Sequence, residues 1–84
     1  MESEQKNINA EAVLICLGQK IKALRLERNW TQEKFAEMAK INDKEVSHIE
    51  AGRRNITIET LVKISNSFGM EPYKLLVENK ENNI

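Results

Sequence analysis

The chain has 84 residues, 13 of them basic and 13 acidic, so its formal net charge at neutral pH is zero. This length indicates one domain near the size at which a hydrophobic core alone becomes marginal, which makes self-association a candidate source of stability. Balanced charge removes the argument that excess positive charge implies nucleic acid, and a single cysteine excludes an internal disulfide.

The start of the chain shows no secretory signal, because no basic start, long apolar run and small-residue cleavage site follow one another. The longest apolar run, residues 12–17, is far too short to cross a bilayer. We therefore expect a cytoplasmic protein that makes no membrane contact. Cys16 lies in this run and is predicted to be buried against the core, with no metal or reactive role.

The pattern of the chain is helical throughout. Glycine and proline are few, and no stretch alternates apolar and polar residues as a half-buried strand does. We predict a flexible segment over residues 1–9, one domain over residues 10–78 and a polar tail over residues 79–84. The first helix is predicted over residues 10–27, capped by Asn9, because large apolar residues recur at three- and four-residue spacing: Leu14, Leu17, Ile21 and Leu24.

Cap residues mark the remaining helices. Thr31 and Asn42 have the positions of N-caps for two short helices, of which the second, at about residues 43–51, ends at Gly52. Thr57 is predicted to cap a fourth helix that ends at Gly69. Pro72 suits the first turn of a fifth, over residues 73–78. The prediction is an all-α, compact five-helix domain.

The second and third helices are joined by residues 40–42 alone, which is the geometry of a helix-turn-helix. On a helical wheel of about 100° per residue, Val46 and Ile49 mark the buried side of the third helix. Lys44, Ser47 and His48 point the opposite way, with Asp43 beside them at the helix start. The third helix therefore presents a polar face to solvent or to a groove.

Glu50 is the misplaced charge of the third helix, because it lies about 40° from Val46 on the buried side. Arg25 is similarly placed on the first helix, about 40° from Ile21. A buried carboxylate without a partner is strongly unfavourable. We predict that Arg25 and Glu50 form an ion pair that sets the angle of the third helix; the alternative is that both side chains reach solvent at the edge of the core.

The segments WTQEKFAEMA (residues 30–39) and VSHIEAG (residues 46–52) together resemble the phage repressor and Cro family of helix-turn-helix DNA-binding domains. Residues 17–25 and 53–61 extend the resemblance on either side. It implies a lambda-repressor-like fold and a sequence-specific regulator of transcription, without a cofactor or metal, that binds an operator in double-stranded DNA.

Individual roles follow from the same resemblance. Thr31 and Gln32 match positions that contact the phosphate backbone, and Arg53 and Arg54 match a basic loop that grips phosphate. The base-reading candidates are the outward residues of the third helix: Asp43, Lys44, Ser47 and His48. The family also pairs an arginine at the position of Arg25 with a glutamate at that of Glu50.

Two acidic residues depart from the family pattern, since Asp43 and Glu45 at a helix start would repel nearby phosphates. Asp43 also suits the positive end of the helix dipole, and an aspartate can accept a hydrogen bond from the amino group of cytosine. Structural and base-reading roles both stay open for Asp43.

One such helix reads only a few base pairs, so the working unit is predicted to be a homodimer on two half-sites. The fifth helix carries more apolar residues than one monomer can cover, which places the dimer surface at the end of the chain. Its predicted residues are Phe68, Met70, Tyr73 and Leu76.

The biological role is open between a restriction-modification controller protein, a phage regulator and an antitoxin-type autoregulator. A protein-interaction module on the same fold is the alternative class, but it would be expected to lose the basic residues beside the third helix. An enzyme is not expected, because the single histidine, His48, has no nucleophile or metal ligand near it in sequence. No small-molecule ligand is expected.

Overall fold

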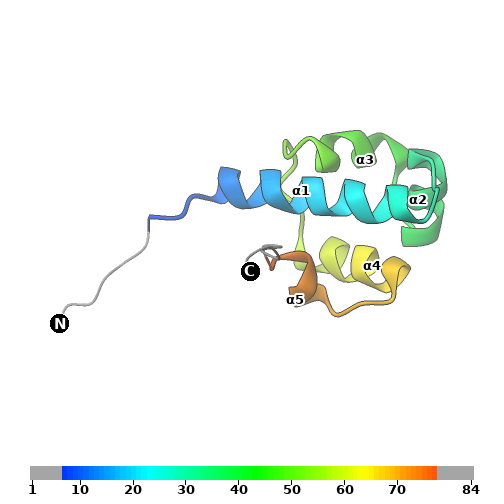
Figure 1. Cartoon of the computed structure of the whole chain (residues 1–84). Helices are drawn as coiled ribbons and strands as arrows, with labels where there is room; N and C mark the ends of the chain where they lie inside the picture. The colour runs from blue at the N-terminus through cyan, green and yellow to red at the C-terminus, as the bar shows by residue number, and fades with distance from the viewer. Residues whose placement is uncertain (1–6, 78–84) are drawn as a thin grey trace.

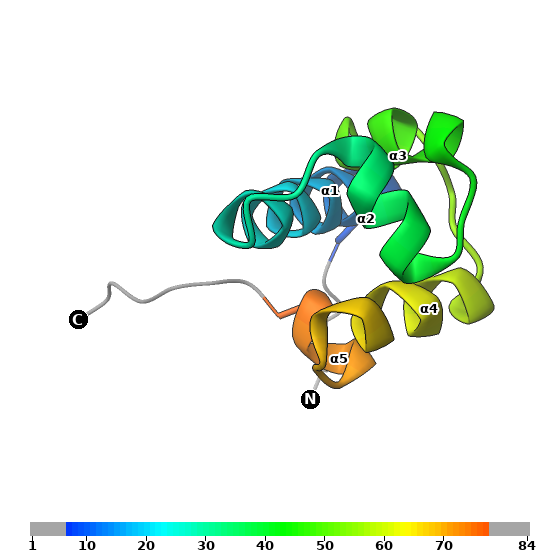
Figure 2. The ribbon, with the colours of Figure 1, turned by 90° about the vertical axis from the view of Figure 1, so that its right-hand side faces the viewer.

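A computed structural model describes residues 7–77, and its described part contains five helices and no strand. The helices are α1 (Ala10–Glu27), α2 (Gln32–Ala39), α3 (Asp43–Glu50), α4 (Ile58–Phe68) and α5 (Pro72–Leu75). In Figure 1, α3 lies on one side of α1 while α4 and α5 lie on the other. Figure 2, turned by 90°, shows α2 between α3 and α4. The all-α, five-helix prediction is confirmed.

The first four helices begin at the predicted caps, because each cap side chain accepts a hydrogen bond from a backbone N–H of the first turn. These bonds are 2.8 to 3.0 Å long and join Asn9 to Ala12, Thr31 to Lys34, Asn42 to Lys44 and Thr57 to Thr60. Gly52 and Gly69 follow α3 and α4 in left-handed conformations that favour glycine.

The fifth helix differs from its prediction. It begins one residue earlier, at Pro72, and ends at Leu75. Leu75 is buried, whereas Leu76 and Val77 are about half exposed. The predicted end at residue 78 and the predicted tail over residues 79–84 lie outside the described residues, as do residues 1–6 of the predicted N-terminal segment.

The core is formed by eleven buried apolar residues: Leu17, Ile21, Phe35, Ala36, Ala39, Val46, Ile49, Leu61, Ile64, Phe68 and Leu75. Trp30 is partly buried and stacks on Phe35 and Phe68, with ring centroids 6.5 and 5.8 Å away. Phe68 is 5% exposed, so it belongs to the monomer core. Its assignment to a dimer surface is therefore corrected: α4 turns this ring toward Trp30 and away from solvent.

Cys16 is exposed, and the prediction that it is buried is wrong. Residues 12–17 form part of α1, so their side chains point in all directions around the helix. Only the stripe through Leu17 and Ile21 faces the other helices. Cys16 lies about 100° from Leu17 and so points away from that stripe. Within residues 7–77, no helix is both long enough and apolar enough to span a membrane.

Helices α1 and α3 approach each other closely at Gly18. A β-carbon at this position would lie 2.6 Å from the backbone oxygen of Glu50 and would also overlap that of Ile49. The last turn of α3 therefore rests directly on the backbone of α1. The missing side chain of Gly18 sets how near the two helices lie.

Replacing Gly18 by alanine tests this contact. In an exposed helix interior alanine is favoured over glycine by about 1 kcal/mol. Here the added β-carbon would overlap the backbone of α3, so alanine should destabilise the domain. The free energy of unfolding, measured by urea denaturation, should fall by about 1–3 kcal/mol. Gln19→Ala, at the exposed next position, is the control and should change stability by less than about 0.5 kcal/mol. A stabilised Gly18→Ala variant would contradict the contact.

Candidate nucleic-acid interface

The pair α2 and α3 is joined by a turn of three residues. Lys40 ends α2 in a left-handed conformation, and the backbone N–H of Ile41 donates back to the carbonyl of Ala36 over 3.0 Å. The Ile41 side chain then packs partly buried against the core. This turn has the length and tightness of a helix-turn-helix and leaves one side of α3 uncovered.

Helix α3 divides into the two faces that the wheel predicted. Val46 and Ile49 are 0% and 3% exposed. The base-reading candidates lie on the other side, where Asp43, Lys44 and Ser47 are exposed and His48 is partly exposed. Their side chains are therefore available to a ligand along one face of the helix.

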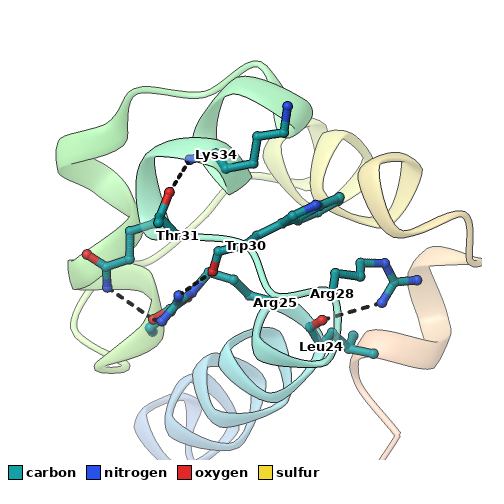
Figure 3. Close-up of polar contacts among 8 residues, drawn as sticks. Leu24, Arg25, Arg28, Trp30, Thr31 and Lys34 are labelled. Carbon is teal, nitrogen blue, oxygen red and sulfur yellow. Dashed lines mark hydrogen bonds and ion pairs between the residues drawn. The ribbon is translucent and has the colours of Figure 1, made fainter.

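Arg25 and Glu50 form the predicted ion pair inside the domain. Arg25 Nε and one terminal nitrogen donate to the two carboxylate oxygens of Glu50, over 2.6 and 3.1 Å. The other terminal nitrogen of Arg25 donates to the carbonyl oxygen of Trp30 over 2.9 Å, as seen in Figure 3. Arg25 thus joins α1, the turn before α2 and the end of α3. The two residues are 8% and 9% exposed.

Gln32 completes this network, which the sequence did not predict. Its side-chain nitrogen donates to Glu50 over 3.1 Å, so the first residue of α2 is linked to the last residue of α3. The neighbouring Thr31 caps α2 through its bond with Lys34 (Figure 3). Both residues at this helix end therefore have internal partners, and their phosphate contacts stay a prediction.

Arg53 and Arg54 follow α3 and are exposed. The Arg54 Nε atom lies 3.0 Å from a carboxylate oxygen of Glu45, which forms an ion pair between the loop and α3. The sequence did not predict this pair. The one signal for it is the wheel position of Glu45, about 40° from Ile49 and thus on the flank of α3.

The remaining predicted residues lie around α5. Tyr73 and Leu76 are 60% and 50% exposed, and Met70 is partly buried against the core. Val77 is also about half exposed, whereas Phe68 is buried. Among the described residues, no group of three histidine, cysteine or acidic side chains has the arrangement of a metal site.

A family model described as helix-turn-helix matches residues 21–75, which include all of α2, α3, α4 and α5. The chain belongs to this helix-turn-helix family. The match covers Arg25, Glu50 and every candidate residue for base and phosphate contact. The residues that carry the family's fold and those of the candidate interface thus lie in the same segment.

The relatives of this helix-turn-helix protein include regulatory proteins. Over 65 residues it is 35% identical to the control protein C.BamHI of Bacillus amyloliquefaciens, a match that covers 76% of this chain and 80% of that protein. The crystal structure of the restriction-modification controller protein C.AhdI from Aeromonas hydrophila has a TM-score of 0.72 and 28% identity, covering 76% and 97% of the two chains.

A third relative is SinR, a master regulator for biofilm formation solved in complex with DNA. It has a TM-score of 0.68 and 31% identity, with 73% of this chain and 98% of that chain covered. The protein is therefore a DNA-binding transcriptional regulator and not an enzyme. This confirms the resemblance read from the sequence.

Disrupting the ion pair should destabilise the domain. Arg25→Met strands the Glu50 carboxylate, and removing one partner of a buried ion pair typically lowers the free energy of unfolding by about 3–5 kcal/mol. Replacing both residues, as in Arg25→Met with Glu50→Leu, should recover part of this loss because no charge is left buried. Urea unfolding of the three proteins measures the difference. A small loss in Arg25→Met alone would contradict the buried pair.

Proposed function

We propose that this protein is a sequence-specific regulator that binds an operator in double-stranded DNA as a homodimer. Helix α3 lies in the major groove, and each subunit reads one half-site. The observation that supports this most directly is that α3 turns Lys44 and Ser47 outward while Glu50, on its other side, is held to α1 by Arg25. A reading helix needs such a free polar face on a firmly fixed support.

The base contacts are assigned by the chemistry of each side chain. Lys44 is exposed and suits the oxygen and nitrogen acceptors of guanine in the major groove. His48 can donate to a purine N7, and Ser47 can donate to or accept from a base edge. Asp43 can accept from the amino group of cytosine, although its place in the first turn of α3 also suits the helix dipole.

The phosphate contacts lie on both sides of α3. Arg53 and Arg54 are exposed directly after it, and Thr31 and Gln32 lie at the start of α2. Phosphate contacts supply affinity for any sequence and fix the register, while base contacts supply the choice of site. Zero net charge suits this division, because weak general attraction to DNA leaves the choice to α3.

The homodimer is proposed to form through the patch of Tyr73, Leu76 and Val77, with Met70 at its edge. These three side chains are 50–60% exposed, and large apolar residues gathered on one surface mark interaction sites. On two half-sites one helical turn apart, the two copies of α3 in the homodimer would lie about 34 Å apart.

The biological role that we propose is control of a restriction-modification system in the cytoplasm. The supporting observation is the similarity to C.BamHI and to the controller C.AhdI, which the chain matches over most of the length of each. A phage regulator and an antitoxin-type autoregulator are the alternatives. The neighbouring genes decide between them: a restriction enzyme with a methyltransferase, a phage module or a toxin.

Selection of bound sequences from random duplex DNA tests the proposed function. We expect one enriched motif with two-fold symmetry, and an affinity for it that falls as salt rises. Absence of an enriched motif, or binding that salt does not weaken, would contradict the proposal.

Alanine variants separate base reading from phosphate contact. Lys44→Ala should change the preferred base at one position of each half-site, with a loss of about 1–3 kcal/mol per subunit on the selected duplex. Arg53→Ala should weaken binding to all sequences alike. It should also reduce the slope of log affinity against log salt concentration by about 1 per subunit. Competition binding to the selected and a scrambled duplex measures both. Identical behaviour of the two variants would show that this assignment is wrong.

Polar substitutions test the dimer patch. Leu76→Ser should weaken dimerisation by at least about tenfold in sedimentation equilibrium, because two copies of this side chain lose their apolar contact. Leu26→Ser is a matched control, since Leu26 on α1 is 53% exposed, like Leu76 at 50%. Equal effects of the two substitutions, or none, would place the interface elsewhere.

A further inference from the structure

We infer that Glu45 competes with DNA phosphate for the Arg54 side chain and so lowers the affinity of the protein for DNA of any sequence. This inference rests on the proposed function, because it takes Arg54 to bind a phosphate. It gives a role to the acidic residue of α3 that neither the base-reading face nor the buried ion pair explains.

The pair lies on the flank of α3. Glu45 Oε1 is 3.0 Å from Arg54 Nε, and the arginine and glutamate side chains are 45% and 39% exposed. On the helix, Glu45 is about 100° from Lys44 and about 40° from Ile49. Its carboxylate is therefore turned from the face of the base-reading candidates toward the loop that follows α3.

The surroundings of the pair are basic. Glu45 and Arg54 line one hollow between the α2–α3 turn and the start of α4, and Lys40 and Lys63 line it too. Among these lining residues Glu45 is the single acid beside three cations. The Glu45 carboxylate therefore lies where these three cations would otherwise attract an anion from solution.

The pair is weak enough to exchange. Ion pairs between exposed side chains typically change an equilibrium constant by about 1.4- to 5-fold. The guanidinium has five N–H donors, and a phosphate has several acceptor oxygens. A phosphate can therefore accept two hydrogen bonds from Arg54 at once. Because a phosphate and the Glu45 carboxylate repel each other, Arg54 should leave Glu45 when it binds DNA.

When Arg54 exchanges the Glu45 carboxylate for a DNA phosphate, less binding energy is gained than when an unpaired arginine binds the phosphate. The loss is the same on every sequence, because a phosphate contact carries no base information. Weak binding to other sites matters for a regulator, since a genome offers a vast excess of competing sequences. Glu45 would thus reduce occupation of those sites without taking part in base reading.

The test measures the affinities of the wild-type protein and Glu45→Gln for the selected operator and for a scrambled duplex at one salt concentration. We expect both affinities to rise by about 1.4- to 5-fold per subunit, with their ratio unchanged. A lower affinity would show that Glu45 positions Arg54 for DNA, and a changed ratio would show that Glu45 takes part in base selection. Either result, or no change, overturns the inference.

Two further comparisons control for simple removal of charge. In an Arg54→Gln background, Glu45→Gln should raise affinity by clearly less than in the wild-type background, because no pair remains to be broken. Glu37→Gln removes an equal charge from α2 and should also have the smaller effect. The inference is overturned if affinity rises equally for Glu45→Gln in the wild-type background, for Glu45→Gln in the Arg54→Gln background and for Glu37→Gln. If the wild-type protein itself does not prefer the operator, the proposed function fails instead, so the two failures are distinct.

Discussion

The ion pair between Arg25 and Glu50 is the constraint on which the candidate interface depends. It joins the end of α3 to α1, and the additional bonds of Arg25 to Trp30 and of Gln32 to Glu50 bring in the turn before α2 and the first residue of α2. Three helices thus meet at one carboxylate. Close approach at Gly18 brings the backbone of α3 onto α1 beside it, so the helix is fixed both by charge and by contact.

The acidic residues of α3 have three different surroundings. Glu50 lies inside and pairs with Arg25, Glu45 lies on the flank and pairs with Arg54, and Asp43 lies in the first turn of the exposed face. These positions explain how a helix with three acids can serve a DNA-binding regulator. Two of the three charges are neutralised by arginines before any phosphate approaches, which accords with a chain of zero net charge.

The helices, their caps and the two faces of α3 were predictable from the sequence, because they depend on neighbours a few residues apart. Even the Arg25–Glu50 pair was predictable, since each residue lies about 40° from a buried apolar residue of its own helix. Contacts made by exposed or amphipathic residues were not predictable from the sequence. The bond from Gln32 to Glu50 and the ion pair of Arg54 depend on where separate elements meet, and the exposure of Cys16 depends on which face of α1 is covered.

Arg25→Lys tests whether the buried ion pair orients α3 for base reading. Lysine keeps the charge but lacks the planar group that contacts both oxygens of Glu50 and the Trp30 carbonyl. With circular dichroism confirming a folded protein, the ratio of operator affinity to scrambled-duplex affinity should fall by about tenfold or more, while affinity for the scrambled duplex changes little. An unchanged ratio in the folded variant would show that α3 does not need this ion pair to read bases.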